Sequence, residues 1–277
     1  MLAAVLAVVG SQAQAQSLSL NFDTPGQYTG NFLTAANITE SSTAGVNDSG
    51  GLVNNGAADA NSIYNASSWD FSQVGDSITL SLMAQIASPI GSSGGTFQMG
   101  LGINSSFVMA GSSASSAAFG SFRLSRSSSG ASGFKIGPQY DGGGILSSST
   151  VQSAAFQLTP GDWYQFNVVL VDTSSSSYSM TATLYDYGTT GLSPVTGTDL
   201  LAAYESGGDS MIDVTGASGA ALVAATAAAP GWRVGTATSG ISALDNFSVV
   251  EPAPEPQSLV LLGFSALLGI KCLKRKI

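Results

Sequence analysis

The residues that most often perform enzyme chemistry are nearly missing from this sequence of 277 residues. It contains no histidine and one cysteine, so neither a Ser-His-Asp group nor a Cys-His pair can form. A single cysteine also supplies no disulfide framework and no thiolate zinc site. Ser93 occupies a Gly-x-Ser-x-Gly sequence, but a nucleophile elbow needs a base, so we interpret this segment as a loop.

Carboxylates are the remaining candidates for acid and base catalysis. Glycoside hydrolysis needs two carboxyl groups, about 5–5.5 Å or 6.5–9.5 Å apart. No expected strand carries a pair of the four glutamates, which are Glu40, Glu205, Glu251 and Glu255. A polysaccharide hydrolase that uses aspartates from different strands stays open as the alternative. We favour a protein without enzymatic activity.

Two aspartates are candidates for a metal site. Asp245 shares strand parity with Phe247 and Val249, so we expect its side chain to point toward the core. An inward carboxylate needs a cation or hydrogen-bond donors to offset its desolvation. Asp23 ends the first expected strand, and the first and last strands of a sandwich are often neighbours. A structural Ca²⁺ held by oxygen ligands is one hypothesis; carboxylates capped by backbone N–H groups or lying at the solvated rim are the favoured alternative.

Aromatic side chains among polar ones are candidates for stacking on a pyranose ring. Tyr185 and Tyr187 fall on the polar parity of their expected strand, which predicts that they are exposed side by side. Trp163 shares the parity of Gln165 and Asn167, so it is also expected to point outward and to be exposed. We therefore consider Trp163, Tyr185 and Tyr187 as glycan contacts, with ordinary core or rim packing as the alternative.

The elements that position these residues are expected to be β strands, because apolar and polar residues alternate with a period of two. This alternation follows six segments, which are Leu18–Phe22, Ile78–Ile86, Phe97–Ile103, Tyr164–Leu170, Tyr178–Leu184 and Leu244–Val250. Residues 16–250 therefore predict one all-β domain, an antiparallel sandwich of two sheets.

Other patterns refine this expectation. Phe166–Asp172 and Tyr178–Tyr185 flank a polar turn and predict an antiparallel hairpin. Only Asp199–Ser206 and Ala220–Ala229 favour helices, and both are short. The run Val46–Ser62, rich in Asn, Asp and Gly, lacks the spacing of a calcium-binding loop and predicts a flexible one.

Three short segments within residues 16–250 resemble concanavalin-A-like jelly rolls. They are Leu20-Asn21-Phe22-Asp23, Pro160-Gly161-Asp162-Trp163-Tyr164 and Leu244-Asp245-Asn246-Phe247. The resemblance implies a jelly-roll sandwich, a fold that occurs in lectins, carbohydrate-binding modules and some glycosidases. A fold does not settle a function, which depends on the site that it carries.

The N-terminus has the pattern of a secretory signal peptide. The uninterrupted apolar run Leu2–Val9 is followed by Ala13-Gln14-Ala15, the A-x-A form that signal peptidase accepts. Residues 1–15 are therefore predicted to be removed, with a buried first strand or helix as the alternative. No Lys or Arg precedes the apolar run, which departs from the usual pattern.

The C-terminus combines an uncharged helix with a basic end. Ser258–Ile270 would span about 20 Å as a helix, which is short of a hydrocarbon core of about 30 Å. Half of the eight basic residues follow it, namely Lys271, Lys274, Arg275 and Lys276. Basic residues stay in the cytoplasm, so this pattern predicts a marginal anchor with the body outside.

Pro254-Glu255-Pro256, placed before this helix and basic end, resembles the PEP-CTERM sorting signal. The resemblance covers residues 254–277. In the predicted domain organisation, residues 251–257 are the linker with the motif, and residues 258–277 are the helix and the basic tail. It implies processing by exosortase, an integral membrane enzyme of bacteria that make exopolysaccharide. A plain tail anchor would explain the helix and charges but not the triplet. We expect export across the inner membrane, a transient C-terminal anchor, and release to the cell surface or extracellular matrix.

The charge balance restricts the partners. The formal net charge is −9, and phosphate binding needs clustered Lys and Arg, so nucleic acid is not expected. Signal peptidase, exosortase and exopolysaccharide are the expected partners. The sequence thus predicts an exported, non-enzymatic bacterial surface or matrix protein with glycan as its candidate ligand.

Overall fold

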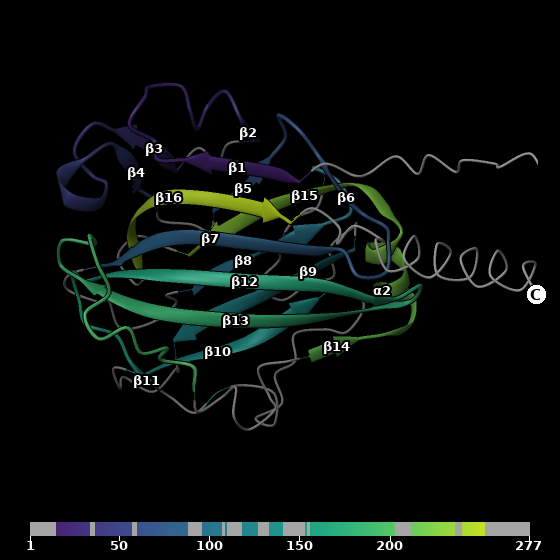
Figure 1. The fold of residues 1–277 in the computed structure, drawn as a ribbon. Helices are drawn as coiled ribbons and strands as arrows, with labels where there is room; N and C mark the ends of the chain where they lie inside the picture. Colours follow the sequence, from purple (N-terminus) through teal and green to yellow (C-terminus); the bar gives the residue numbers. More distant parts are fainter. Residues whose placement is uncertain are drawn as a thin grey trace, which may run out of the picture.

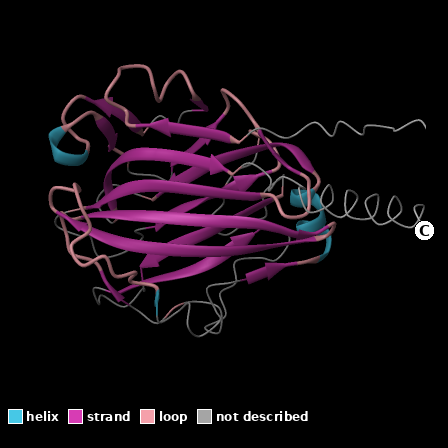
Figure 2. Ribbon diagram, viewed as in Figure 1, coloured by secondary structure: helices cyan, strands magenta, loops and turns pink. Residues whose placement is uncertain are grey.

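Two antiparallel β sheets packed face to face make up the protein, as a computed structural model shows (Figures 1 and 2). The structure describes residues 15–33, 37–56, 60–87, 96–106, 109, 118–126, 133–140, 153, 156–202, 212–235 and 240–252. Residues 1–14 of the predicted signal peptide, Ser93, and the predicted sorting signal at 254–277 lie outside these ranges. No helix within the described ranges is long and apolar enough to cross a membrane.

Sheet A has eight strands, and the expected first and last ones are neighbours. Its order is β14 (Ile212–Val214), β13 (Ser177–Gly188), β12 (Trp163–Ser174), β7 (Ser77–Ile86), β16 (Ile241–Glu251), β4 (Gly51–Asn54) and β3 (Ile38–Ser41), and β1 (Gln16–Leu20) also pairs with β16. The predicted hairpin is confirmed as β12 and β13, which pair as far as Ser174 and Ser177.

Sheet B has eight strands as well and lies behind sheet A in Figure 1. Its order is β11 (Phe156–Gln157), β10 (Gly133–Tyr140), β9 (Phe119–Arg126), β8 (Thr96–Gly102), β15 (Ala225–Val234), β5 (Ala60–Tyr64) and β2 (Phe32–Leu33), and β6 (Trp69–Phe71) also pairs with β15. The described helices are the short η1 (Val46–Asp48) and α2 (Gly216–Val223).

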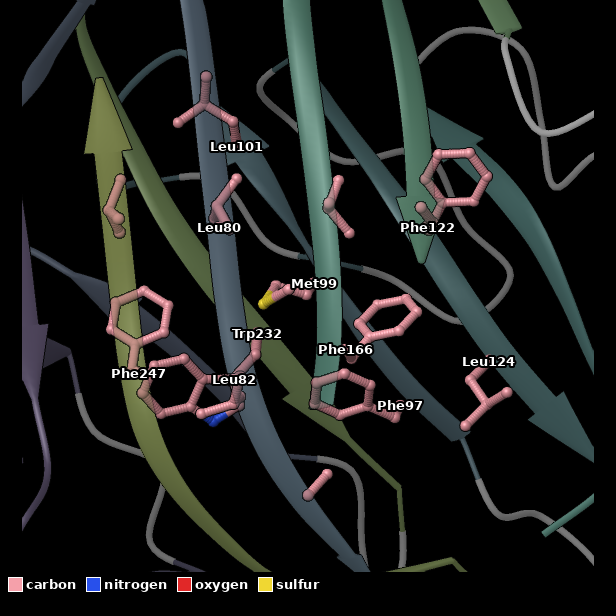
Figure 3. Close-up of a cluster of buried hydrophobic side chains, with 14 of the residues drawn as sticks. Leu80, Leu82, Phe97, Met99, Leu101, Phe122, Leu124, Phe166, Trp232 and Phe247 are labelled. Atoms are coloured by element: carbon pink, nitrogen blue, oxygen red, sulfur yellow. The ribbon is translucent and has the colours of Figure 1, made fainter. Parts of the chain in front are cut away.

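The core fills the space between the sheets with the predicted inward faces (Figure 3). Leu80, Leu82 and Phe166 of sheet A meet Phe97 and Met99 of sheet B, and each is at most 1% exposed. Rings interlock edge to face: the Phe97 and Phe166 centroids are 5.1 Å apart at an interplanar angle of 78°. Such burial of apolar area is the main source of folding free energy in a sandwich.

One predicted helix is wrong in most of its length. Residues 220–229 were expected to be helical, but α2 ends at Val223 and β15 begins at Ala225. Ala228 and Ala229 are buried in sheet B, because β15 pairs with β8 and carries Trp232 into the core. Pairing and burial here outweigh the high helix propensity of alanine. Of the second expected helix, residues 203–206 lie outside the described ranges.

A candidate ligand cleft on the outer face of sheet A

The outer face of sheet A carries a small apolar cluster of its own. Side chains alternate across a strand, and Leu82 and Ala84 belong to the main core, so Met83 points to the other side. There Met83 packs with Trp163, Val46 and Ala243. This outer face is therefore partly covered instead of being uniformly solvated.

The cover is the turn around η1, which the sequence predicted to be a flexible loop. Within the run 46–62 the structure has η1, β4 and the start of β5, so that prediction is wrong. The turn is closed by the Gly45 N–H, which donates to the Ser49 carbonyl at 2.8 Å, and by the Asn47 N–H, which donates to the Thr190 carbonyl at 2.9 Å. Asn47 and Asp48 take positive φ angles of 54° and 60°, a region that Asn and Asp tolerate best among non-glycine residues.

Gly45 is required by this close approach of the turn to sheet A. A Cβ atom at this position would lie 1.9 Å from the Gly50 carbonyl oxygen and 2.7 Å from Oδ2 of Asp245. Both distances are far below van der Waals contact. Only glycine lets the chain close over the carboxylate here.

Asp245 lies on the outer face, which corrects the predicted inward orientation. It is paired with Met83, and a bulge follows it in β16 before Ser248 pairs with Ser81. Asn246, with φ of 52°, occupies this bulge. A β bulge inserts one residue and so changes the parity of everything beyond it. Asp245 is nevertheless 1% exposed, because the turn around η1 covers it.

Backbone groups satisfy the buried carboxylate of Asp245. Its Oδ2 accepts hydrogen bonds from the Val46 N–H at 2.8 Å and the Ser49 hydroxyl at 3.4 Å, and its Oδ1 accepts from the Asn246 N–H at 2.6 Å. Burial raises the pKa of Asp245 to about 6, and the nearby charge of Asp23 adds to the rise, while the hydrogen bonds from Val46, Asn246 and Ser49 oppose it. Desolvation of the charged form outweighs these bonds.

Asp23 holds the other end of the same turn. Its Oδ1 accepts a hydrogen bond from the Gly50 N–H at 2.8 Å, and the Asn21 amide donates to its Oδ2. The two aspartates considered for Ca²⁺ are thus close in space, but both are capped by backbone N–H groups, which favours the metal-free alternative. Among the described residues, no group of three or more His, Cys, Asp or Glu side chains is arranged to hold a metal ion.

A cleft of about 430 Å³ opens between this turn and the loop at Thr189 and Thr190. Trp163, Gln85 and Ala243 line its sheet side, and Asn47 and Asp48, both exposed, line its rim. Oε1 of Gln85 accepts a hydrogen bond from the Ser242 hydroxyl at 3.2 Å. The cleft therefore has amide, hydroxyl and carboxylate groups around a floor that includes the almost completely buried Trp163.

Of the three predicted glycan contacts, Trp163 lines this cleft and Tyr187 packs against the same cluster. Trp163 points outward as its parity predicted, but it is 2% exposed, because Val46 packs on it. Tyr185 and Tyr187, which were predicted to be exposed, are half-buried. Tyr187 packs against the Trp163 cluster and donates its hydroxyl hydrogen to Oε1 of Gln165 at 3.0 Å. Trp163 lines the cleft, and Tyr187 supports the cluster beside it.

Carboxylates from different strands do approach one another near the end of sheet A. The charge of Asp186, in β13, contributes to raising the pKa of Asp162, although burial is the larger cause. Asp186 also accepts a hydrogen bond from the Tyr164 hydroxyl at 3.3 Å. Asp162, just before β12, and Asp186 are one pair on which a hydrolase could depend, and Asp172 with Asp76, at the other end of β12, is a second.

Comparison with solved structures identifies the architecture. Arcelin-5, a lectin-like defense protein from Phaseolus vulgaris, aligns over 87% of this chain and 100% of its own, with a TM-score of 0.51 and 11% identity. The chain has a concanavalin-A-like jelly-roll fold. The jelly roll also aligns with an endo-1,3-beta-glucanase from Streptomyces sioyaensis, at 10% identity over 88% and 97% of the two chains and a TM-score of 0.48.

An alginate lyase, Aly36B, aligns with this jelly roll at 13% identity over 86% and 98% of the two chains, with a TM-score of 0.43. No family model matches the chain, and no curated protein matches it. The likeness to arcelin-5 concerns the fold alone, so the site must be judged by its own residues.

Proposed function

We propose that this chain is a non-enzymatic glycan-binding protein, and that the cleft beside Trp163 is its binding site. The observation that carries this proposal is the composition of the cleft: hydroxyl and amide groups around an apolar floor at Trp163 and Ala243, and one carboxylate, that of Asp48, among the described lining residues. A sugar ring presents C–H groups to an apolar floor and hydroxyls to polar groups. A single carboxylate cannot supply the acid and base pair of glycoside hydrolysis.

The cellular setting is part of the proposal and depends on sequence features. The A-x-A segment ending at Ala15 supports export, and Pro254-Glu255-Pro256 with the basic end supports sorting by exosortase. The chain would then be a surface or matrix protein, with exopolysaccharide as its ligand. Signal peptidase and exosortase are the two processing partners in this proposal.

A glycan array probed with the full-length chain tests the binding function. Asp48→Asn keeps a residue that tolerates the positive φ at this position, so it should remove the rim charge without moving the turn. Loss of roughly one charge-assisted hydrogen bond should weaken binding about tenfold. Asp213→Asn, an exposed change of the same kind in β14, is the matched control. Equal binding by Asp48→Asn and the unchanged chain would argue against this cleft.

A polysaccharide hydrolase is the second candidate, because Asp162 lies beside Asp186 and has a raised pKa. A raised pKa suits a general acid, and a neighbouring carboxylate suits its partner. Release of reducing ends from a polysaccharide by the purified chain, abolished by Asp162→Asn or by Asp186→Asn, would favour this candidate. Hydrolysis that persists in both variants would remove this pair from consideration.

A further inference from the structure

The basic residues of the sandwich belong to the sheet opposite the cleft. Before Lys271 the sequence has four basic residues, and each belongs to a strand of sheet B: Arg123, Arg126, Lys135 and Arg233. The strands of sheet A contain six acidic residues and no basic one, namely Glu40, Asp172, Asp186, Asp213, Asp245 and Glu251. Neither the strands under the cleft nor any loop before residue 271 therefore supplies a cation to it.

The turn that forms one wall of the cleft uses its backbone donors inside the protein. The Val46 N–H donates to the carboxylate of Asp245, and the Gly50 N–H donates to that of Asp23, each at 2.8 Å. The Asn47 N–H donates to a backbone carbonyl at 2.9 Å. Successive N–H groups of a turn can bind an anion, but here the chain's own oxygens occupy them. These N–H groups are therefore not available to an anionic ligand.

Hydrogen-bond acceptors line the same cleft. The amide nitrogen of Gln85 donates to the Gly161 carbonyl at 3.2 Å, which fixes the orientation of the amide, and its Oε1 accepts from the Ser242 hydroxyl. An amide oxygen has two lone pairs, so Oε1 can accept a second hydrogen bond. Asp48, exposed at the rim, adds a carboxylate. The lining thus suits a ligand that donates hydrogen bonds.

An ammonium group meets these conditions better than a hydroxyl or a carboxylate. It has three donors and no acceptor, so it needs none of the occupied N–H groups. A hydrogen bond between ammonium and carboxylate is roughly twice as strong as a neutral one. The carboxylates of Asp23 and Asp245 bind the same turn, and charges of one sign around a cleft concentrate their field in it. A carboxylate on the ligand would be repelled.

We propose that the glycan bound in this cleft is a polymer of amino sugars whose amino groups are free and protonated. The inference rests on the proposed function of the cleft and narrows its ligand to one chemical class. The rings and hydroxyls of such a polymer use the apolar floor and the polar lining, while an amino group pairs with Asp48. A neutral glycan makes only the first set of contacts, so the amine decides the affinity.

Isothermal titration calorimetry of the full-length chain at pH 5.5, where primary amines are protonated, tests this inference with two hexamers of one backbone. The β-1,4-linked glucosamine hexamer carries free amines, and the N-acetylglucosamine hexamer carries none. The glucosamine hexamer should bind roughly tenfold more tightly, the effect of one charge-assisted hydrogen bond. Added salt should weaken its binding and leave that of the acetylated hexamer unchanged, because only the first contact is between charges.

Equal affinity for the two hexamers, or tighter binding of the acetylated one, would overturn the amine inference and leave the glycan-binding function in place. The same holds if neither hexamer binds but another glycan of the array does. Absence of binding to every glycan would contradict both the inference and the function. Hexalysine bound as tightly as the glucosamine hexamer would also overturn the inference, because charge without a sugar would then be sufficient.

Charge changes at the rim locate the contact. Asp48→Asn should reduce the difference in affinity between the two hexamers to about twofold or less, because the charged partner of the amine is lost. Thr189→Lys, on the exposed loop across the cleft, should weaken the glucosamine hexamer more than the acetylated one. Asp213→Asn, in β14 and outside the cleft lining, is the matched control and should keep the preference. A preference that survives both rim changes would overturn the inference. The salt dependence of the unchanged chain tests it even if a variant fails to fold.

Discussion

Oδ2 of Asp245 accepts a hydrogen bond from the backbone N–H of Val46 at 2.8 Å, across 199 positions of sequence. This bond joins the last strand of sheet A to the turn that forms one wall of the cleft. The side chain of Val46 packs on Trp163 in the same place. The shape of the cleft therefore depends on a buried carboxylate whose ionisation is costly.

Stability should fall as the pH rises through the titration of Asp245. Burial raises the pKa of Asp245 from its ordinary value to about 6, so between these two values the folded state holds a proton that the unfolded state has released. The free energy of unfolding should then decrease by up to about 3 kcal/mol between pH 4 and pH 7. Asp76, Asp172 and Glu251 have raised pKa values and act in the same direction.

Urea unfolding at pH 4.5 and pH 7.5 measures this change in the free energy of unfolding. The same measurement on Asp245→Asn shows how much of the change comes from Asp245. An asparagine does not ionise, so the variant should lose most of the Asp245 contribution and show a smaller difference between the two pH values. Its amide also places a donor where one carboxylate oxygen accepts, so it should be less stable at low pH. A variant with the same pH dependence as the unchanged chain would contradict the role given to Asp245.

Gly45→Ala should open the turn around η1. The added methyl group would collide with the Gly50 carbonyl and the Asp245 carboxylate, and overpacking of this kind costs about 2 kcal/mol. The thermal midpoint Tm should fall, and glycan binding at the cleft should weaken with it. Ser42→Ala, an exposed change three positions away and outside the cleft lining, controls for substitution in the same segment. An unchanged Tm in Gly45→Ala would mean that the turn is not packed as described.

The sequence predicts well which side chains face the core between the sheets, and predicts poorly how side chains on the outer face of sheet A are buried. The reasons are physical. The inward faces of β7 and β12 follow the period of two, because each strand has one buried side. The burial of Trp163 depends instead on Val46, more than a hundred positions away, and no local pattern encodes that contact. The orientation of Asp245 fails because a bulge at Asn246 changes parity, and a bulge is set by pairing with a neighbouring strand.

The position of the basic residues in sheet B also illustrates what the sequence does not contain. Arg123 and Arg233 are far apart in the chain, and only the pairing of β9, β8 and β15 brings them into one row. The one signal available beforehand was that basic residues are scarce and fall outside the segments rich in acids. Only the strand order shows that these basic residues lie in one sheet.

Calcium should have no effect on the stability of the β-sandwich domain. The carboxylates of Asp23 and Asp245 accept hydrogen bonds from the backbone N–H groups of Gly50 and Val46, so these oxygens already have donors that a cation would have to displace. Melting curves of the purified chain in calcium and in excess chelator should coincide. A Tm that drops in chelator and recovers with calcium would restore the metal hypothesis for this pair.

Processing at both ends should be visible in the mature protein. Terminal mass spectrometry of the surface fraction should find a chain that begins at Gln16 and lacks the segment after Pro256, because Ala13-Gln14-Ala15 suits signal peptidase and Pro254-Glu255-Pro256 suits exosortase. Changing that triplet to alanines should leave the protein in the membrane fraction, held by the apolar helix and its basic end. An intact tail in the surface fraction would reduce the signal to a plain anchor, and unchanged release of the alanine variant would exclude exosortase as the processing enzyme.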